Sequence, residues 1–96
     1  KMSGYNGWKN YETWLVGLWF SDSYNEYFLE QFRCGDLLTN VSADEVRDYV
    51  VGWVDEEVPE NGFVADLVNS SLHEVDWREL ANHVEEMLKY EMENAA

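Results

Sequence analysis

Three side chains that could bind a metal ion stand at helical spacing late in the sequence: Glu79, His83 and Glu86. Positions i, i+4 and i+7 share one face of a helix, and carboxylate and imidazole groups are ligands for divalent cations. A di-iron type of bundle, however, needs repeated Glu-x-x-His helices, which this sequence lacks. We therefore favour a solvated helix face, expect no metal and no cofactor, and keep a metal-dependent enzyme only as an alternative.

Other catalytic motifs are absent from the sequence. It contains no H-E-x-x-H, G-x-S-x-G, P-loop or G-x-G-x-x-G pattern. Cys34 is the single cysteine, which excludes an intramolecular disulfide, and it stands at a helix end where the dipole disfavours a thiolate. The segment 22–26 has oxygen ligands at alternating places but lacks the glycine that a calcium loop requires. We predict no catalytic residues and no enzyme.

Acidity is the strongest chemical signal. The 96 residues hold 20 Asp and Glu against 6 Lys and Arg, a net charge of −14, and 15 of the acids lie in 44–96. This balance argues against direct binding of nucleic acid. Carboxylates at i and i+4 of a helix lie about 5–6 Å apart, so acidic helices can imitate an array of phosphates and attract a basic nucleic-acid channel. Charge that serves only solubility is the alternative.

The candidate partner-binding acids fall into two groups. The first group follows one expected helix and its exit: Asp44, Glu45, Asp48, Asp55, Glu56, Glu57 and Glu60. The second group lies on the last expected helix: Glu79, Glu85 and Glu86.

Aromatic side chains form a second candidate surface, around Tyr5, Trp8 and Phe20. Trp8 precedes the first helix, and it is either an exposed anchor for a partner or a lid over the end of the bundle. Stacking of nucleic-acid bases on these rings would need basic neighbours, which are few. The spare apolar residues Val51, Phe20 and Leu29 could form a homodimer patch.

Helical periodicity dominates the sequence and predicts one all-α domain over residues 1–96, with residues 1–9 as an N-terminal arm. The fold class is a compact, irregular bundle of four to five short helices. The expected helices start near Asn10, at Ser21 or Asp22, after the S-x-x-E capping box at Ser42, at Phe63 and at Asp76. Gly35 is expected to end the second helix.

The expected core follows from the apolar stripes of these helices. Trp14, Leu18 and Trp19 are expected in the core, and Leu37 and Leu38 are expected to plug a gap in it. One face of the fourth helix carries Phe63, Val64, Leu67, Val68, Ser71 and Leu72. The expected buried stripe of the fifth helix is Trp77, Leu80, Ala81, Val84 and Leu88, and it could extend to Met92.

No apolar run approaches the ~20 residues that span a bilayer, and the first residues do not have the pattern of a signal peptide. We expect no membrane contact and a cytoplasmic location.

Two phrases carry a family resemblance. Residues 6–19, NGWKNYETWLVGLW, resemble the W-x-N-Y-E-T-W-x-V-x-L-W opening of a family of short, acidic proteins from bacteriophages and mobile elements. Residues 71–81, SLHEVDWRELA, resemble the closing L-x-E-V-[DN]-W-x-E-I-A phrase of the same family, with Leu80 in place of Ile. We expect the residues of both phrases to have structural roles. The tryptophans of the first phrase would pack in the core, and Asp76 with Glu79 would cap the last helix.

The resemblance implies a small accessory phage protein, a class that includes anti-restriction and anti-CRISPR inhibitors, several of them acidic DNA mimics, and it supplies no catalytic residue. We therefore expect a non-enzymatic acidic inhibitor in a bacterial host cell. Its partner would be a basic nucleic-acid-binding protein, either a CRISPR effector or a restriction enzyme, whose nucleic-acid binding it blocks. The alternative is an interaction module that blocks the assembly of its partner through the aromatic surface.

Overall fold

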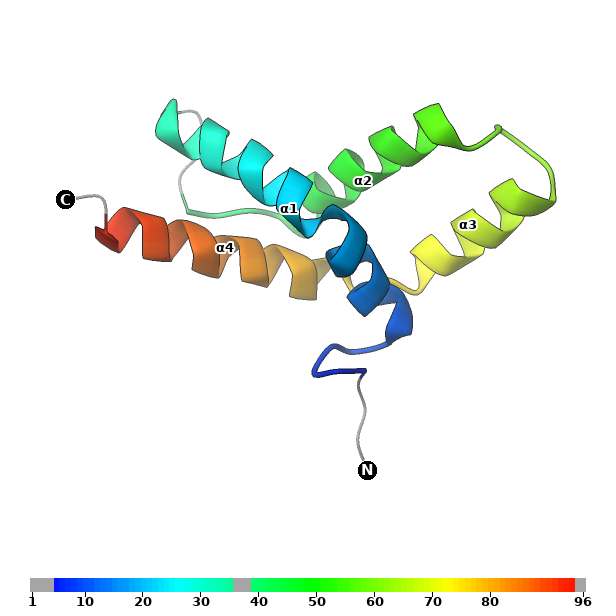
Figure 1. The fold of residues 1–96 in the computed structure, drawn as a ribbon, viewed down its shortest axis with the longest axis horizontal. Helices are drawn as coiled ribbons and strands as arrows, with labels where there is room; N and C mark the ends of the chain where they lie inside the picture. Colours follow the sequence, from blue (N-terminus) through cyan, green and yellow to red (C-terminus); the bar gives the residue numbers. More distant parts are fainter. Residues whose placement is uncertain (1–4, 36–38, 95–96) are drawn as a thin grey trace.

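Four helices make up the fold in the computed structural model, which describes residues 5–35 and 39–94: α1 (Tyr11–Arg33), α2 (Ala43–Glu57), α3 (Phe63–His73) and α4 (Trp77–Asn94) (Figure 1). The described residues contain no strand, only an isolated bridge between Tyr5 and Trp8. The predicted all-α class with four to five helices is confirmed.

Helix α1 runs through the point where two helices were expected to meet. Ser21 and Asp22 lie in the middle of its 23 residues, so the predicted break there is wrong. Neither Gly nor Pro stands next to them to end the preceding turn, and the buried side of α1 continues from Val16 to Tyr24 and Phe28. The predicted stop is confirmed, because Gly35 follows α1 with a φ of +81°.

Local capping signals set the ends of α2 and α4. Both hydrogen bonds of the predicted capping box are present at the start of α2, between Ser42 and Glu45. The helix ends at Glu57, just before Val58 and Pro59, as expected. At the start of α4, Asp76 Oδ1 accepts a hydrogen bond of 3.1 Å from the backbone N of Glu79.

The core lies between α1, α2 and α4. On α4 the predicted stripe is confirmed for Leu80, Ala81, Val84 and Leu88, which are fully buried, and Trp77 is partly buried. Its extension to Met92 is wrong, because that side chain is 53% exposed near the end of the helix. The fully buried residues of α4 meet the buried side chains of the other two helices, which are Val16, Tyr24 and Phe28 of α1 and Val46 and Val50 of α2. Burial of these side chains supplies most of the hydrophobic stabilisation.

The predicted core position of three α1 residues is corrected. Leu18 is 61% exposed, Trp19 is 75% exposed, and Trp14 is only partly buried. Helix α1 instead turns small residues toward α4: a Cβ atom at Gly17 would stand 3.5 Å from Leu80 Cδ2. The side chain of Leu80 therefore lies against the backbone of α1 at Gly17, and Leu18 and Trp19 beside it are left outside.

Helix α3 lies at the edge of the molecule. Ala65 is its only fully buried residue, whereas Phe63, Val64 and Leu67 of the expected packed face are exposed. Figure 1 shows α2 and α3 extending together to one side, away from the far ends of α1 and α4. The molecule measures 50 × 38 × 17 Å, so it is a flat plate with helices that are covered on few sides.

The connection between α1 and α2 was expected to fill a gap in the core. Leu37 and Leu38 lie outside the described residues, and Val41 at the end of the same connection is buried.

Within the described part of the chain, none of the helices combines the length and the apolar character needed to cross a bilayer.

Candidate partner-binding surfaces

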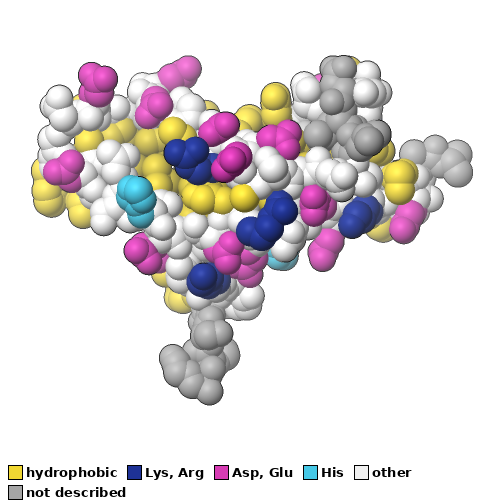
Figure 2. Space-filling view, turned by 180° about the vertical axis from the view of Figure 1, so that it is seen from behind, with side chains coloured by type: hydrophobic (Ala, Val, Ile, Leu, Met, Phe, Trp, Pro, Cys, Tyr) yellow, Lys and Arg dark blue, Asp and Glu magenta, His cyan; other side chains and the backbone are white. Residues whose placement is uncertain are grey.

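Acidic side chains are spread widely over the surface (Figure 2). On the face shown in Figure 2, Asp and Glu side chains alternate with Lys and Arg, around a band of apolar side chains. This face is mixed in charge. The acids on this face therefore do not form a continuous negative surface (Figure 2).

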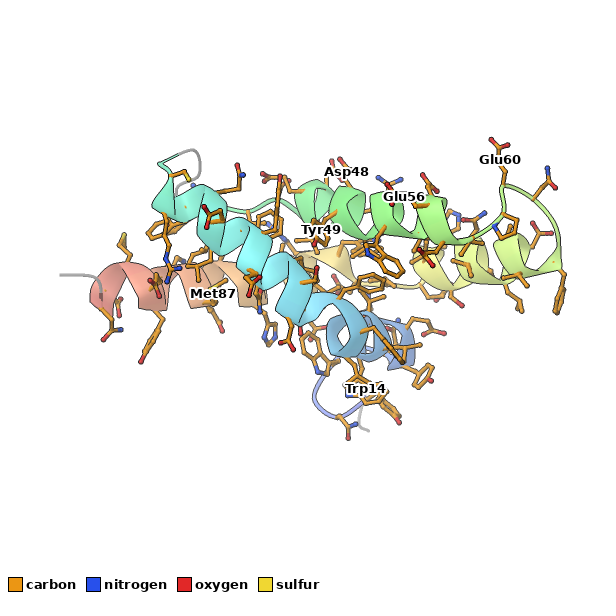
Figure 3. The ribbon with its side chains drawn as sticks, turned by 45° about the horizontal axis from the view of Figure 1, so that its top comes forward. Trp14, Asp48, Tyr49, Glu56, Glu60 and Met87 are labelled. Carbon is orange, nitrogen blue, oxygen red and sulfur yellow. The ribbon has the colours of Figure 1, made fainter. Side chains whose placement is uncertain are left out.

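Helix α2 and the loop after it carry seven exposed acids. We define the α2 acidic edge as its acids together with the one in the following loop, all of them exposed: Asp44, Glu45, Asp48, Asp55, Glu56, Glu57 and Glu60. Asp44, Asp48 and Asp55 stand four and seven positions apart, so they share one side of the helix. Figure 3 shows Asp48, Glu56 and Glu60 following one another along α2 and its loop, away from Met87 of α4 and Trp14 of α1.

The packing of α2 explains the direction of this edge. Val46 and Val50 are fully buried against the core, and they lie on the side of the helix opposite Asp48. The hydrophobic stripe thus turns Asp44, Asp48 and Asp55 outward. Glu57 lies on the same side of the helix as the two valines, and it is exposed at the last position of α2. Arg47 forms an ion pair with Asp48 at 3.2 Å, but both side chains are exposed and the pair compensates little of the charge.

The expectation that acids of α4 also bind the partner stays a prediction, and two of these acids already accept hydrogen bonds from the backbone of the chain. Glu79 Oε1 accepts a 3.0 Å hydrogen bond from the backbone N of Lys9, and Glu85 Oε2 accepts one of 2.8 Å from the backbone N of Val41. Both carboxylates are partly buried and hold chain segments in place. Glu86 is exposed.

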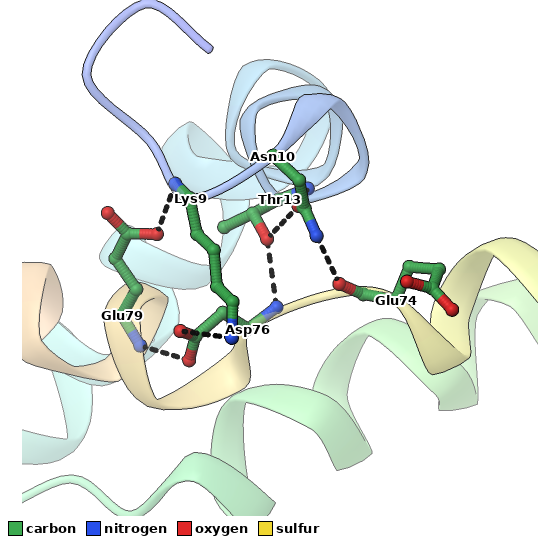
Figure 4. A network of polar contacts seen from close by, with 6 residues as sticks. All are labelled: Lys9, Asn10, Thr13, Glu74, Asp76 and Glu79. Carbon is green, nitrogen blue, oxygen red and sulfur yellow. Dashed lines mark hydrogen bonds and ion pairs between the residues drawn. The ribbon is translucent and has the colours of Figure 1, made fainter. Parts of the chain in front are cut away.

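The two sequence phrases meet in one polar network, which we call the phrase junction (Figure 4). Asn10, the N-cap of α1, accepts from the backbone N of Thr13 and donates through Nδ2 to the carbonyl of Glu74 at 2.7 Å. The hydroxyl of Thr13 accepts a 2.8 Å hydrogen bond from the backbone N of Asp76. The caps of α1 and α4 are therefore tied together, so these motif residues are architectural.

Trp8 acts as a lid and not as an exposed anchor. Its ring stacks on His83 of α4, with the centroids 4.4 Å apart, and it lies close to Gly17. The tight turn from Tyr5 to Trp8, closed by backbone hydrogen bonds of 2.6 and 2.8 Å, brings the ring there. His83 is thus engaged with an aromatic ring, and the described residues contain no group of three or more His, Cys, Asp or Glu placed to hold a metal ion.

An apolar groove lies between α1 and α3. We define the α1–α3 groove by the side chains of its two walls: Leu15, Trp19 and Phe20 from α1, and Leu67, Val68 and Leu72 from α3. Val54 of α2 also lines the groove, which has a volume of about 370 Å³. Glu12 is the only charged residue that lines it.

Comparison with known proteins places the chain in a family. The model of the DUF7249 family, a family of unknown function, matches residues 1–95. The chain belongs to the DUF7249 family. No curated protein and no solved structure matches it. Membership in DUF7249 brings no activity or partner with it, so the functional argument rests on the surfaces described above.

Sequence reasoning missed the groove of this DUF7249 protein, although a signal for it was present. The apolar residues of α3 include Phe63, Val64, Leu67, Val68 and Leu72, and at 100° per residue they span about 180°, half of the helix circumference. A peripheral helix cannot bury so wide an arc against one neighbour. The width of the arc therefore indicated an uncovered apolar surface.

Proposed function

We propose that this DUF7249 protein is a non-enzymatic binding protein that occupies a basic nucleic-acid-binding surface of another protein through the α2 acidic edge. The observation that carries the proposal is the set of exposed carboxylates on α2 and its loop, of which Asp44, Asp48 and Asp55 lie opposite the buried side of the helix. Residues 49–77 contain no Lys or Arg, so no cation from this stretch neutralises these carboxylates.

Simple electrostatics supports this role. Carboxylates one helical turn apart are separated by about 5–6 Å, a spacing of the same order as that of phosphates along a strand. A row of fixed negative charges on a chain of net charge −14 accelerates its association with a positively charged channel. The same attraction weakens as salt screens it, with a Debye length of about 8 Å at physiological ionic strength.

The proposed target is a bacterial defence complex, either a CRISPR effector or a restriction enzyme, in the cytoplasm of the host cell. The support for this target is the resemblance of residues 6–19 and 71–81 to the phrases of phage and mobile-element proteins. Such complexes expose basic channels for nucleic acid, and the α2 acidic edge is complementary to them in charge.

A competition assay tests the proposal. Purified CRISPR effectors and restriction enzymes are titrated with the protein in the presence of labelled DNA, and bound DNA is measured by fluorescence anisotropy. We expect inhibition of at least one complex, with a half-inhibitory concentration that rises with the DNA concentration and with salt. Inhibition that depends on neither, or no inhibition in either class of complex, would contradict the proposal.

A second candidate function is an interaction module that acts through apolar and aromatic contacts. The surface expected from Tyr5, Trp8 and Phe20 does not form as one exposed patch, because Trp8 stacks on His83 and Phe20 packs edge-on against Trp53. The exposed apolar side chains gather instead around α1 and α3, where Trp19 and Leu67 stand at the groove. This location favours the second candidate through a different surface.

A further inference from the structure

We propose that the α1–α3 groove binds a basic amphipathic helix of a partner protein. The first observation is the chemistry of the groove: aliphatic and aromatic side chains from α1, α2 and α3 line nearly all of it. Trp19 and Leu67 belong to its walls and are 75% and 53% exposed. Exposed apolar surface of this kind marks a site where a partner excludes water.

The shape of the groove fits a helix. Helix α3 has 11 residues and is therefore about 16 Å long, which corresponds to three turns of a second helix lying beside it. A helix in an apolar groove presents side chains at i, i+3, i+4 and i+7, and these would contact Leu15 and Trp19 on one wall and Leu67 on the other. The added helix would pack α3, of which only Ala65 is now fully buried.

Charge selects the kind of helix. Residues 10–32 and 48–77 provide every residue that lines the groove, and neither range contains Lys or Arg. Glu12 lines the groove itself, Asp22 is an exposed acid of α1, and Glu74 is an exposed acid at the residue after α3. An apolar ridge flanked by Lys and Arg is complementary to this surface.

The same charges disfavour a second copy of the chain in the groove. Two copies that each carry −14 repel one another, and the ranges that line the groove supply no cation to offset this repulsion. The proposal is independent of the α2 acidic edge, since it depends on the walls of the groove and on the acids around it. One partner can use both surfaces.

Synthetic peptides provide the test. The first is a helical peptide of about 14 residues with Leu on one face, at i, i+3, i+4 and i+7, and Lys elsewhere. The second has the same composition with the Leu residues scattered over all faces, and the third has Glu in place of Lys. Calorimetric titration of the full chain is expected to give at least about tenfold tighter binding for the first peptide than for the second, and none for the third.

Matched variants of the chain locate the binding. Trp19→Ser and Leu67→Ser, in the walls, are expected to weaken binding of the first peptide about tenfold or more. Leu18→Ser and Phe63→Ser are the controls. Leu18 belongs to α1 and Phe63 to α3, and their side chains are 61% and 79% exposed but do not line the groove. Circular dichroism of all four variants checks that the helices are retained.

The outcomes separate this proposal from the function proposed above. Equal affinity for the patterned and scattered peptides, or equal losses in wall and control variants, would overturn the groove proposal, and so would tighter binding of the acidic peptide. Asp44→Asn with Asp48→Asn, at the end of α2 remote from Val54, should leave peptide affinity within about twofold. A loss of DNA competition with intact peptide binding would therefore concern the α2 acidic edge alone.

Discussion

Thr13 is the residue on which the phrase junction depends most. It is fully buried, its hydroxyl donates to Asn10 Oδ1 at 2.6 Å, and the same oxygen accepts from the backbone N of Asp76 at 2.8 Å. One hydroxyl thus serves the start of α1 and the residue before α4. Loss of that group leaves a buried backbone donor without an acceptor.

Thr13→Val is accordingly expected to lower the free energy of unfolding by about 2 kcal/mol, although it preserves the shape of the side chain. Thr13→Ser keeps the hydroxyl and should cost less. Urea unfolding followed by circular dichroism measures both variants. Equal stability of Thr13→Val and the parent protein would show that the junction does not tie the two caps together.

Tyr24 gives a prediction about alkaline pH. It is 2% exposed, and its burial raises the pKa of the phenol from 10.0 to about 12. The folded state therefore holds the proton more tightly than the unfolded state. The contribution of this group to stability is complete below pH 10 and is lost as the pH rises from 10 to about 12, at about 1.4 kcal/mol per pH unit.

Tyr24→Phe removes that ionisation, so its free energy of unfolding should fall less steeply than that of the parent between pH 10 and 12. Denaturant unfolding at several pH values in this range measures the two slopes. The other tyrosines are common to both proteins and cancel in the comparison. Identical slopes would mean that Tyr24 ionises as freely in the folded chain as in the unfolded one.

At the scale of elements, the continuity of α1 is the feature most in need of a test. Asp22 is exposed in the middle of the helix, where Ala has the higher helix propensity. Asp22→Ala should therefore raise the free energy of unfolding by about 0.5 kcal/mol. If Asp22 instead capped a separate helix, the same change would cost about 1 kcal/mol, so thermal or urea unfolding distinguishes the two structures by sign.

Helix ends could be predicted from sequence where the signal is local. Ser42 with Glu45, Asp76 with Glu79, and Gly35 each act within a few residues, so short patterns suffice to find them. The inside of α1 could not be predicted in this way. Leu18 and Trp19 recur at helical spacing, and so do the smaller Thr13, Val16 and Gly17. The contact of Leu80 with Gly17 places the smaller residues on the buried side of α1.

At the scale of the whole molecule, long-range hydrogen bonds sort the acidic residues. Glu79 and Glu85 bind backbone groups of Lys9 and Val41, which lie 70 and 44 positions away in the sequence. No local pattern distinguishes them from Glu86 or from the acids of α2. The sequence therefore predicted the acidity, but only the fold separates the two α4 carboxylates that bind backbone groups from the acids that point into solvent.

The central claim is that position, and not net charge alone, makes the α2 acidic edge a binding surface. The test compares two triple variants in the DNA competition assay. Asp55→Asn, Glu56→Gln and Glu57→Gln neutralise the edge, whereas Glu26→Gln, Glu30→Gln and Glu93→Gln neutralise exposed acids of α1 and α4. Each triple changes the net charge equally, from −14 to −14 + 3 = −11.

The measurement is the half-inhibitory concentration of each triple variant against the complex that the parent protein inhibits, at moderate salt. The edge variant is expected to be about tenfold weaker than the parent, and the control variant within about twofold of it. Equal inhibition by the two variants would contradict the account, because the position of the carboxylates on α2 would then have no part in binding.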